Sequence, residues 1–488
     1  MLITYYIIYT IDNKLVDNME NQFDVCVLGG GPGGYVAAIR ASQLGAKVVL
    51  VEKDKLGGTC LNWGCIPTKA LLESASLYRK VKNLAEYGLK ADNISFDSKQ
   101  IVDYSRRSAS KLSNGIGFLM QKNNITIVHG IGSIQKNGQI FVDIEKNGKK
   151  SLIKSKNIII ATGGRFKPLP NINVESEKIL TYKEAMVQTT FPKSLTIIGG
   201  GPIGVEFASF YNTFGTNITL IESQKYLLPS SDHDVSTAMH NSLASQGIKI
   251  LNNAKVQEIS TKHNQVQTVL IDDDGKQRYN MSDLVLVAIG SKPNIENIGI
   301  ENIKLELHNG YIKTNSNMQT NEPNIYAIGD VTAPPWLAHK ASFEGIIAAE
   351  HIMGLKTRPL FVNNIPSCVY SYPQVASVGL TEIQAKQQGY NIRVGKFPLN
   401  ANGKAIVQNP NSIGFVKTIF DCDTNELLGA HMIGDNVTEL IHGYTVAKSG
   451  ELTSHELIHT VFPHPTLSES MHESVLKAYN QAVHIGNK

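Results

Sequence analysis

Cys60 and Cys65, five positions apart, are the residues of this chain whose type and spacing point most directly to chemistry. They lie in the stretch GGTCLNWGCIPTKALL, which begins at Gly57. A zinc site would need two further ligands nearby, and the chain has no second close cysteine pair, so a redox disulfide is the better interpretation. A regular helix would separate positions five apart by about 7.5 Å along its axis, which is too far for a disulfide. The segment is therefore expected to be distorted locally, and Gly64 permits this.

The number of cysteines argues against a secreted protein held together by disulfides. Five cysteines in 488 residues are few for such a framework, and the number is odd. Cys26, Cys368 and Cys422 are interpreted as small buried apolar residues. The formal net charge is +4 and no long basic block is present, so a nucleic-acid partner is not expected.

Two glycine-rich segments, FDVCVLGGGPGG and SLTIIGGGPIG, repeat at a constant spacing. Each passes from a short apolar run through glycines into a helix-like stretch, and a second apolar run that ends in glutamate follows about twenty residues later. Gly29 and Gly199 are 170 positions apart (199 − 29 = 170), and so are Glu52 and Glu222 (222 − 52 = 170). The repeat predicts two βαβ units that bind dinucleotides.

The chemistry of these units follows from the residue types. The glycines permit a tight turn and a close approach of the backbone, and a pyrophosphate can lie on the positive N-terminus of the following helix. The glutamate is placed to bond a ribose hydroxyl, and its charge repels a 2′-phosphate. After Glu222 no arginine occurs before Arg278, so the second unit is expected to prefer NAD to NADP.

A histidine between two prolines stands in the segment FPHPTLSE near the C-terminus. The side chain of His464 is suited to carry a proton near neutral pH. Glu469 could bond its other ring nitrogen and set its tautomer, as the acid does in catalytic triads. Taken alone, however, one histidine and one glutamate would more often be surface residues.

Further apolar runs show how these residues are positioned. The strand-like segments NIIIATGG, LVLVAIGSKPN and NIYAIGD follow the glycine units, and two helices are expected between Pro67 and Lys122. From about Phe361 the runs VASVGL, GFVKTIF and LLGAHMIG alternate like strands before helical segments, which predicts a separate α+β domain. The predicted fold class is α/β, with two Rossmann-like domains, the first split by the second, and a C-terminal α+β dimerisation domain.

The segment around Cys60 resembles the active-site signature of the flavin-dependent disulfide reductases, the class I pyridine nucleotide-disulfide oxidoreductases, and most closely the dihydrolipoamide dehydrogenases among them. IIIATGG, VAIGSKPN, YAIGD, LAHKASFEG, YSYPQVASVGLTE and FPHPTLSES match as well, so the resemblance covers nearly the whole chain from about Asn21 to about Asn480. One departure is Phe462, where the family commonly has the first histidine of His-x-His-Pro. That histidine is not the base, so a difference in packing is expected.

The resemblance implies an enzyme that oxidises protein-bound dihydrolipoyl groups of 2-oxoacid dehydrogenase or glycine cleavage complexes and reduces NAD. Cys60 would react with the substrate thiol and Cys65 would face the flavin. His464 would be the base and Glu469 its orienting partner. The family forms homodimers in which the histidine comes from the other subunit.

The resemblance also implies the cofactor contacts. Lys69 would lie near the flavin and pair with Glu206. FAD would be bound by Gly29, Gly31, Gly34, Glu52, Lys53, Thr59, Lys69, Gly132, Ala161, Thr162, Gly163, Asp330 and Ala338. NAD would be bound by Gly199, Gly200, Gly201, Pro202, Ile203, Gly204, Glu222, Val256 and Gly290. The predicted division is an extension at 1–18, an FAD domain at 19–164 and 293–360, an NAD domain at 165–292, and a dimerisation domain at 361–488.

The apolar N-terminal run MLITYYIIYTI is too short for a spanning helix of about 20 residues and lacks the positive start of a signal peptide. Residues 1–18 are therefore interpreted as a disordered extension or an upstream start before Met19, and a cytoplasmic enzyme with no membrane partner is expected.

Related enzymes fit the sequence less well. Mercuric reductases and large thioredoxin reductases carry a C-terminal cysteine pair, whereas the last cysteine here is Cys422. Glutathione reductases would favour NADP, which Glu222 disfavours, and a transhydrogenase of this fold would lack the complete cysteine pair. A non-catalytic subunit would not need Cys60, Cys65 and His464 to be intact.

Overall fold

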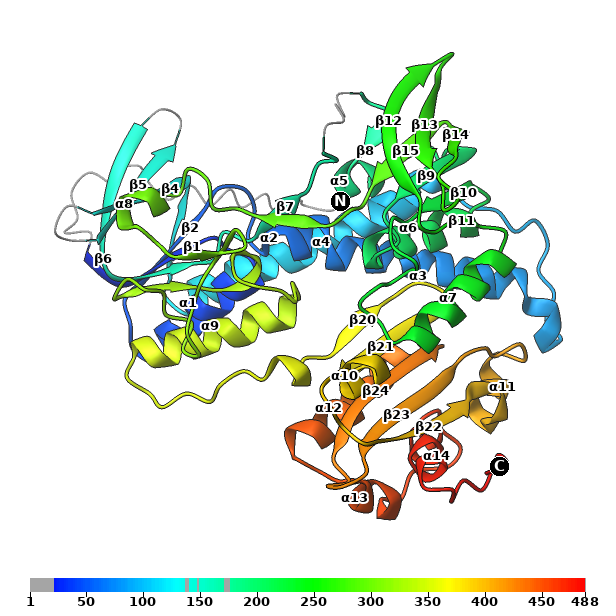
Figure 1. Cartoon of the computed structure of the whole chain (residues 1–488). Coiled ribbons are helices and arrows are strands. Elements are labelled where there is room, and N and C mark those ends of the chain that lie inside the picture. The colour runs from blue at the N-terminus through cyan, green and yellow to red at the C-terminus, as the bar shows by residue number, and fades with distance from the viewer. Residues whose placement is uncertain (1–21, 137–139, 147–148, 171–175, 488) are drawn as a thin grey trace, which may run out of the picture. The chain divides into compact units, whose positions relative to one another are not determined.

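The computed structural model describes residues 22–136, 140–146, 149–170 and 176–487. The extension predicted at 1–18 lies outside these residues. The chain divides into two compact units (Figure 1). The first consists of Met1–Leu61, Lys111–Gly164 and Pro293–Leu360, and the second of Asn62–Ser110, Arg165–Lys292 and Phe361–Lys488. The finer division into FAD, NAD and dimerisation domains stays a prediction.

A seven-stranded sheet forms the centre of the first unit. Its order is β3 (Thr126–His129), β2 (Val48–Glu52), β1 (Gln22–Leu28), β6 (Lys149–Ile160), β5 (Ile140–Lys146) and β4 (Ile131–Lys136), and β19 (Ile325–Ala327) also pairs with β6. Strands β3, β2, β1, β6 and β19 pair in parallel, whereas β5 pairs antiparallel with both β6 and β4. Every residue of β2 is buried, as expected for a parallel strand that is covered on both faces.

Helices α1 (Pro32–Gln43) and α9 (Ala338–Ile352) lie side by side in the first unit (Figure 1). They meet through glycine, because a Cβ built at Gly345 would lie only 2.6 Å from the carbonyl oxygen of Gly33. The short elements of this unit are α8 (Ile300–Ile303), β17 (Leu307–His308), β18 (Tyr311–Ile312) and the 3-10 turn η3 (Gly329–Val331). Strands β7 (Gly164–Phe166) and β16 (Ser291–Pro293) lie where the chain passes between the units.

The second unit contains another parallel sheet. Its order is β11 (Lys249–Leu251), β10 (Asn217–Ile221), β9 (Ser194–Ile198), β15 (Leu284–Val287) and β8 (Ile179–Leu180). Helices α6 (Pro202–Thr213), α7 (His233–Ser245) and the single turn α5 (Tyr182–Ala185) belong to it, as does the antiparallel sheet β12 (Lys255–Lys262), β13 (Gln265–Ile271) and β14 (Gln277–Ser282). One apolar core joins α3 (Cys65–Lys82) to α6 through side chains such as Leu71 and Phe207.

The C-terminal part of the second unit is an antiparallel five-stranded sheet. Its order is β20 (Ser367–Val369), β21 (Gln374–Gly379), β24 (Leu427–Gly434), β23 (Phe415–Asp421) and β22 (Ile392–Pro398). The helices around it are α10 (Glu382–Gln387), α11 (Gly403–Gln408), α12 (Val437–Ser449), α13 (Ser454–His459) and α14 (Glu469–Ala478). The predicted α/β class with a C-terminal α+β part is confirmed.

The remaining helical elements lie between the first two strands of the chain and β3, and the first two of them carry the cysteine pair. They are α2 (Gly58–Trp63), α3, the 3-10 turn η2 (Leu84–Tyr87) and α4 (Ser98–Lys122), so the two helices predicted between Pro67 and Lys122 are confirmed. Two further 3-10 turns, η4 (Val362–Asn364) and η5 (Leu399–Ala401), occur in the C-terminal part. Among the described helices, none combines the length and the apolar character needed to cross a bilayer.

Candidate active site

The cysteine pair lies across a break between two helices. Cys60 belongs to α2, Cys65 is the first residue of α3, and Gly64 between them has φ −146° and ψ −107°, far from helical values. Cys60 and Cys65 are disulfide-bonded, and the three other cysteines are free. The local distortion predicted from the spacing is therefore confirmed.

One turn beyond Cys65 on α3, the ammonium group of Lys69 is held by a buried carboxylate. Its Nζ lies 3.0 Å from both carboxylate oxygens of Glu206, which is 5% exposed. The backbone N–H of Tyr370 donates to the same carboxylate at 2.9 Å, and the Lys69 ammonium lies 4.6 Å from the centre of the Tyr370 ring. Lys69 and Glu206 therefore form the predicted pair, and these contacts fix the direction of the lysine side chain.

The first glycine loop joins β1 to α1 and leaves no room for side chains. A Cβ at Gly29 would come well under 3.0 Å from the carbonyl oxygen of Ala161, and one at Gly34 would clash equally with the carbonyl of Gly29. Gly29 also has a φ of +105°, which residues with a side chain rarely adopt. Gly31 begins α1 without a side-chain cap, so the backbone itself forms the open N-terminus of this helix.

Glu52, at the end of β2, is fixed beside this loop. Its Oε2 accepts the N–H of Gly30 at 2.6 Å and its Oε1 accepts the N–H of Asp54 at 2.7 Å. The side chain is 8% exposed. The N–H of Gly57 donates to the carbonyl of Gly30 at 2.8 Å, so the chain after β2 folds back over the loop.

The second glycine loop, between β9 and α6, repeats this geometry. Glu222 accepts the N–H of Gly200 at 2.6 Å and the N–H of Gln224 at 2.7 Å, which are the distances found for Glu52. The N–H of Leu228 donates to Gly200 at 2.8 Å, as Gly57 does to Gly30. Two segments with a shared residue pattern have thus folded alike, and the predicted duplication is confirmed.

Both loops fit a dinucleotide. A Cβ at Gly201 would meet nothing within 4 Å, and Gly201 begins α6 without a side-chain cap, so the N–H groups there face open space. Gly58 packs against Gly31. A Cβ added at Gly58 would lie 2.7 Å from the Gly31 Cα, so position 58 is restricted to glycine. Uncapped backbone donors at a helix N-terminus beside a fixed carboxylate match a pyrophosphate and a ribose.

The crowding at Gly204 gives a first prediction. A Cβ there would lie well under 3.0 Å from the carbonyl oxygen of Gly199, so Gly204→Ala must displace α6 from the loop. We expect the free energy of unfolding of the second unit to fall by about 2 kcal/mol or more, as overpacking does, in a denaturant titration. Gly201→Ala is the matched control, because its Cβ has space and its φ of −75° suits alanine. Equal stability of the two variants would contradict the close approach.

The other residues predicted to contact FAD gather at the carboxyl ends of the parallel strands of the first unit. Ala161, Thr162 and Gly163 follow β6, whose end meets β1 through the N–H of Ala161 and the carbonyl of Leu28 at 2.8 Å. Thr162 Oγ1 donates to the carbonyl of Asn294 at 2.7 Å. Lys53 follows β2, Thr59 lies in α2, Gly132 lies in β4, Asp330 lies in η3 and Ala338 begins α9. Ligands of α/β sheets bind at this edge.

Asp330 is held by a buried ion pair that the sequence analysis missed. Lys340 Nζ lies 2.6 Å from Glu344 Oε1, and both side chains are 6% exposed. Glu344 Oε2 accepts the N–H of Gly329 at 2.7 Å, and Lys340 donates to Thr332 Oγ1 at 3.3 Å, so the pair fixes the turn on both sides of Asp330. Burial, opposed by Lys340 and reinforced by Glu344, raises the pKa of Asp330 to about 6. The spacing of four residues within LAHKASFEG was the available signal.

The residues predicted to contact NAD lie at the carboxyl ends of β9, β10 and β15. Pro202 and Ile203 form the first turn of α6, and Gly290 follows β15 with a φ of +109° and open space at its Cβ position. The carbonyl of Glu222 accepts the N–H of Ala254, which brings the start of β12 and Val256 towards this edge. The members of this predicted set thus converge within the second unit.

His464 and Glu469 form the predicted pair at the start of α14. The Nδ1–H of His464 donates to Glu469 Oε1 at 2.8 Å, and the N–H of Thr466 donates to Glu469 Oε2 at 2.9 Å. The His464 side chain is 78% exposed, so its Nε2 is available to a reacting group. Burial acts to raise the pKa of Glu469, but the bonds from Thr466 and His464 outweigh it and hold that pKa below its usual range.

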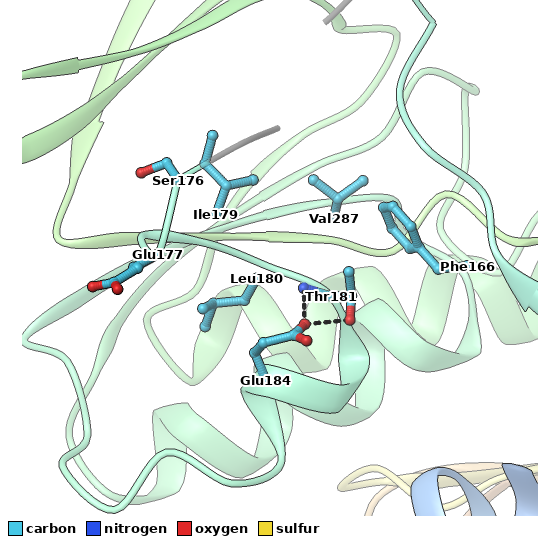
Figure 2. Close-up of a pocket in the computed structure, with 8 residues that line it drawn as sticks. All are labelled: Phe166, Ser176, Glu177, Ile179, Leu180, Thr181, Glu184 and Val287. Atoms are coloured by element: carbon cyan, nitrogen blue, oxygen red, sulfur yellow. Dashed lines mark hydrogen bonds between the residues drawn. The ribbon is translucent and has the colours of Figure 1, made fainter. Parts of the chain in front are cut away.

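A cavity of about 290 Å³ lies elsewhere in the second unit (Figure 2). Phe166, Leu180 and Val287 give it apolar walls, and none of the predicted site residues lines it. Two carboxylates, Glu177 and Glu184, line it as well, and Glu184 accepts the N–H of Thr181 at 2.9 Å and thereby caps the single turn α5. The Glu184 carboxylate therefore already has a structural role.

Comparison with curated proteins gives relatives over almost the full length. The dihydrolipoyl dehydrogenase of Zymomonas mobilis is 48% identical over 467 residues, which cover 96% of this chain and 100% of that protein. The Bacillus subtilis protein of the same name is 43% identical, with the same shares covered. A Glycine max protein named leghemoglobin reductase is 39% identical and covers 95% of this chain and 88% of that protein.

Solved structures with similar folds include LpdA of Mycobacterium tuberculosis, with a TM-score of 0.86 at 26% identity, and the HOCl-induced flavoprotein disulfide reductase RclA of Escherichia coli, with 0.82 at 27%. Each covers 93% of this chain, and this chain covers 99% of each. A family model for pyridine nucleotide-disulphide oxidoreductases matches residues 23–345, and one for the dimerisation domain of these proteins matches residues 365–475. The redox disulfide, the two alike glycine loops and these matches show that the chain belongs to the pyridine nucleotide-disulphide oxidoreductase family.

Proposed function

We propose that the chain acts as a dihydrolipoyl dehydrogenase, which oxidises dihydrolipoyl groups and reduces NAD. The observation that carries this proposal is the Cys60–Cys65 disulfide at the helix break, in a chain whose relatives at 43% and 48% identity bear that name. The dihydrolipoyl groups are those attached to proteins of 2-oxoacid dehydrogenase or glycine cleavage complexes.

The cysteine pair performs a dithiol–disulfide exchange. A substrate thiolate attacks Cys60, forms a mixed disulfide and releases Cys65 as a thiolate. The second substrate thiol then attacks the mixed disulfide, closes the lipoyl ring and returns Cys60 as a thiol. The substrate loses two electrons and two protons, and the cysteine pair gains the two electrons.

The base for this exchange is His464. Its free Nε2 takes the proton of the attacking thiol, while the Glu469 carboxylate, which can only accept, keeps the other proton on Nδ1. In the homodimer that the dimerisation domain supports, His464 of one subunit serves the cysteine pair of the other. Each site is then incomplete in a single chain.

The two glycine loops hold the cofactors, FAD on Gly29–Gly34 with Glu52 and NAD on Gly199–Gly204 with Glu222. When bound, FAD would supply the two-electron acceptor for the cysteine pair and the hydride donor for NAD. Lys69, whose ammonium is held by Glu206, lies one helical turn from Cys65 on α3 and would lie near the bound flavin.

A steady-state assay tests this proposal. Dihydrolipoamide and glutathione are each supplied with NAD and with NADP, and reduction of the nucleotide is followed by absorbance. We expect turnover with dihydrolipoamide and NAD. Reduction of NADP by glutathione, with none of NAD by dihydrolipoamide, would overturn the assignment.

The preference for NAD gives a second prediction. Glu222→Gln keeps an oxygen for the Gly200 N–H but removes the charge that repels a 2′-phosphate. We expect the ratio of the dissociation constants of NADPH and NADH, measured by fluorescence titration, to fall about tenfold, which corresponds to about 1.4 kcal/mol. Asp273→Asn is the control, because it removes one negative charge from an exposed turn between β13 and β14 of the same unit, and its ratio should change less than about twofold. An unchanged ratio in Glu222→Gln would show that another group selects the nucleotide.

A further inference from the structure

The segment between the two cysteines needs support that the helices do not supply. The break at Gly64 interrupts the regular backbone ladder between α2 and α3, so the residues just before it cannot rely on helical hydrogen bonds alone. While the disulfide is closed, the bond between Cys60 and Cys65 also restrains this segment. When the pair is reduced, that restraint is lost, and other contacts must keep the two sulfurs within reach of each other.

Arg106 of α4 contacts this segment directly. Its Nη1 donates to the carbonyl of Asn62 at 2.9 Å, and its guanidinium lies 4.9 Å from the centre of the Trp63 ring. Its Nη2 points to the sulfur of Met186 at 3.6 Å. Arg106 is partly buried, and this burial lowers the pKa of its guanidinium.

Two neighbouring contacts make the arrangement firmer. Ser105, which precedes Arg106 and is fully buried, donates from Oγ to the carbonyl of Pro67 at 3.0 Å, on the far side of the break. The Trp63 ring is also approached by a second cation, because Lys183 Nζ lies 5.6 Å from its centre. Consecutive residues of α4 thus hold the chain on both sides of Gly64, and the indole between the cysteines lies against cations from α4 and α5.

We propose that Arg106 is a positioning residue for the redox pair. It holds the carbonyl of Asn62 and the indole of Trp63, and thereby keeps Cys60 and Cys65 within bonding reach of each other in both the oxidised and the reduced state. The inference rests on the proposed redox role of the disulfide and extends it to a residue of α4 that binds the segment between the two cysteines. A dithiol that is held in place loses less freedom when the disulfide closes, so this contact favours the closed form.

The test is a redox titration of the intact protein. Samples are equilibrated with a series of dihydrolipoamide to lipoamide ratios and quenched in acid, and the free thiols are alkylated and counted by mass. The cysteine pair of Arg106→Met should be half reduced at a dihydrolipoamide to lipoamide ratio about tenfold lower than the ratio that half reduces the unchanged protein. This difference is equivalent to about 30 mV for a two-electron couple. Arg106→Lys keeps the charge but not the planar group, and should move the midpoint in the same direction.

Arg107→Met is the matched control, because Arg107 is the next residue of α4 and is exposed. It removes the same charge and should leave the midpoint unchanged. Trp63→Leu removes the ring below the guanidinium and should move the midpoint as Arg106→Met does, so it decides the question if Arg106→Met does not fold. A purely structural role would lower thermal stability without moving the midpoint.

Three results would overturn the inference. The first is an unmoved midpoint in Arg106→Met, and the second is an equal shift in Arg107→Met. The third is a shifted midpoint in Arg106→Met with an unmoved one in Arg106→Lys, because the effect would then be one of charge alone. The proposed function fails in a distinguishable way, because the disulfide of the unchanged protein would then not be reduced by dihydrolipoamide at any ratio.

Discussion

Cys65→Ser is expected to reduce the steady-state rate with dihydrolipoamide and NAD by about 10⁴-fold or more, the scale on which the loss of a covalent nucleophile acts. Without the Cys65 sulfur, Cys60 cannot form the disulfide that accepts the electron pair. Serine has nearly the same volume as cysteine, so the break at Gly64 should persist. The measurement is NADH formation at saturating substrate, together with a thermal unfolding scan to show that the fold is retained.

Cys422→Ser is the matched control for this result, because Cys422 is a free and partly buried cysteine of the same unit. Its activity should stay within about twofold of the unchanged protein, in line with a surface substitution. A single-turnover trap separates the two cysteines of the pair: Cys65→Ser should still form an adduct through Cys60 with a reactive lipoyl disulfide. A Cys65→Ser protein that turns over at a normal rate would remove the basis of the proposed exchange.

Features set by backbone geometry could be predicted from the sequence alone. The glycines at 29, 34, 199 and 204 stand where a Cβ would clash, and each glutamate follows its glycines at the spacing that dinucleotide-binding βαβ units use. The broken helix at Gly64 could be predicted as well, because a disulfide between positions five apart is incompatible with a regular helix. In these cases steric limits within a short segment of the sequence determine its structure.

Contacts between distant elements could not be predicted in this way. Lys417 lies on β23, a strand with every residue buried, and its ammonium bonds Asp232 at 2.9 Å and Glu382 at 2.7 Å. A lysine in an antiparallel strand normally predicts a solvent face, and only the packing of α7 and α10 around this sheet explains its burial. Arg106 is similar, because nothing in the α4 sequence indicates which carbonyl it binds.

Phe462, the position that departs from the family pattern, is a feature that could be predicted only in part. The sequence predicted a difference in packing, and the structure places its ring against His472, with centres 5.0 Å apart and planes 18° apart. His472 Nε2 lies 2.8 Å from the carbonyl of Ile458 and is therefore the donor of that hydrogen bond. The chain thus has an apolar ring, stacked on His472, where the family has a polar one, and the His464–Glu469 bond is present.

His464→Gln is expected to lower kcat/KM for dihydrolipoamide by about 10²- to 10⁴-fold, the contribution of a positioned general base. Glutamine can still donate to Glu469 but cannot take a proton from the substrate thiol. His484→Gln is the matched control, because His484 makes the same kind of bond, from Nδ1 to Oε1 of another α14 carboxylate, Glu473, at 2.8 Å, and is 65% exposed. Its rate should change less than about twofold. Equal losses in both variants would mean that His464 has no special role.

Mixing two inactive variants tests which subunit supplies the histidine base to each site. A heterodimer of a Cys65→Ser subunit with a His464→Gln subunit contains one site with an intact cysteine pair and an intact histidine only if His464 acts on the other subunit. Random exchange would yield half heterodimers with one working site of two, so about a quarter of the unchanged activity should return. If the histidine served its own chain, the mixture would remain as inactive as its parents, because every site would then lack either the base or the disulfide. The exposure of His464, 78% in the single chain, is what a residue directed at a partner subunit requires.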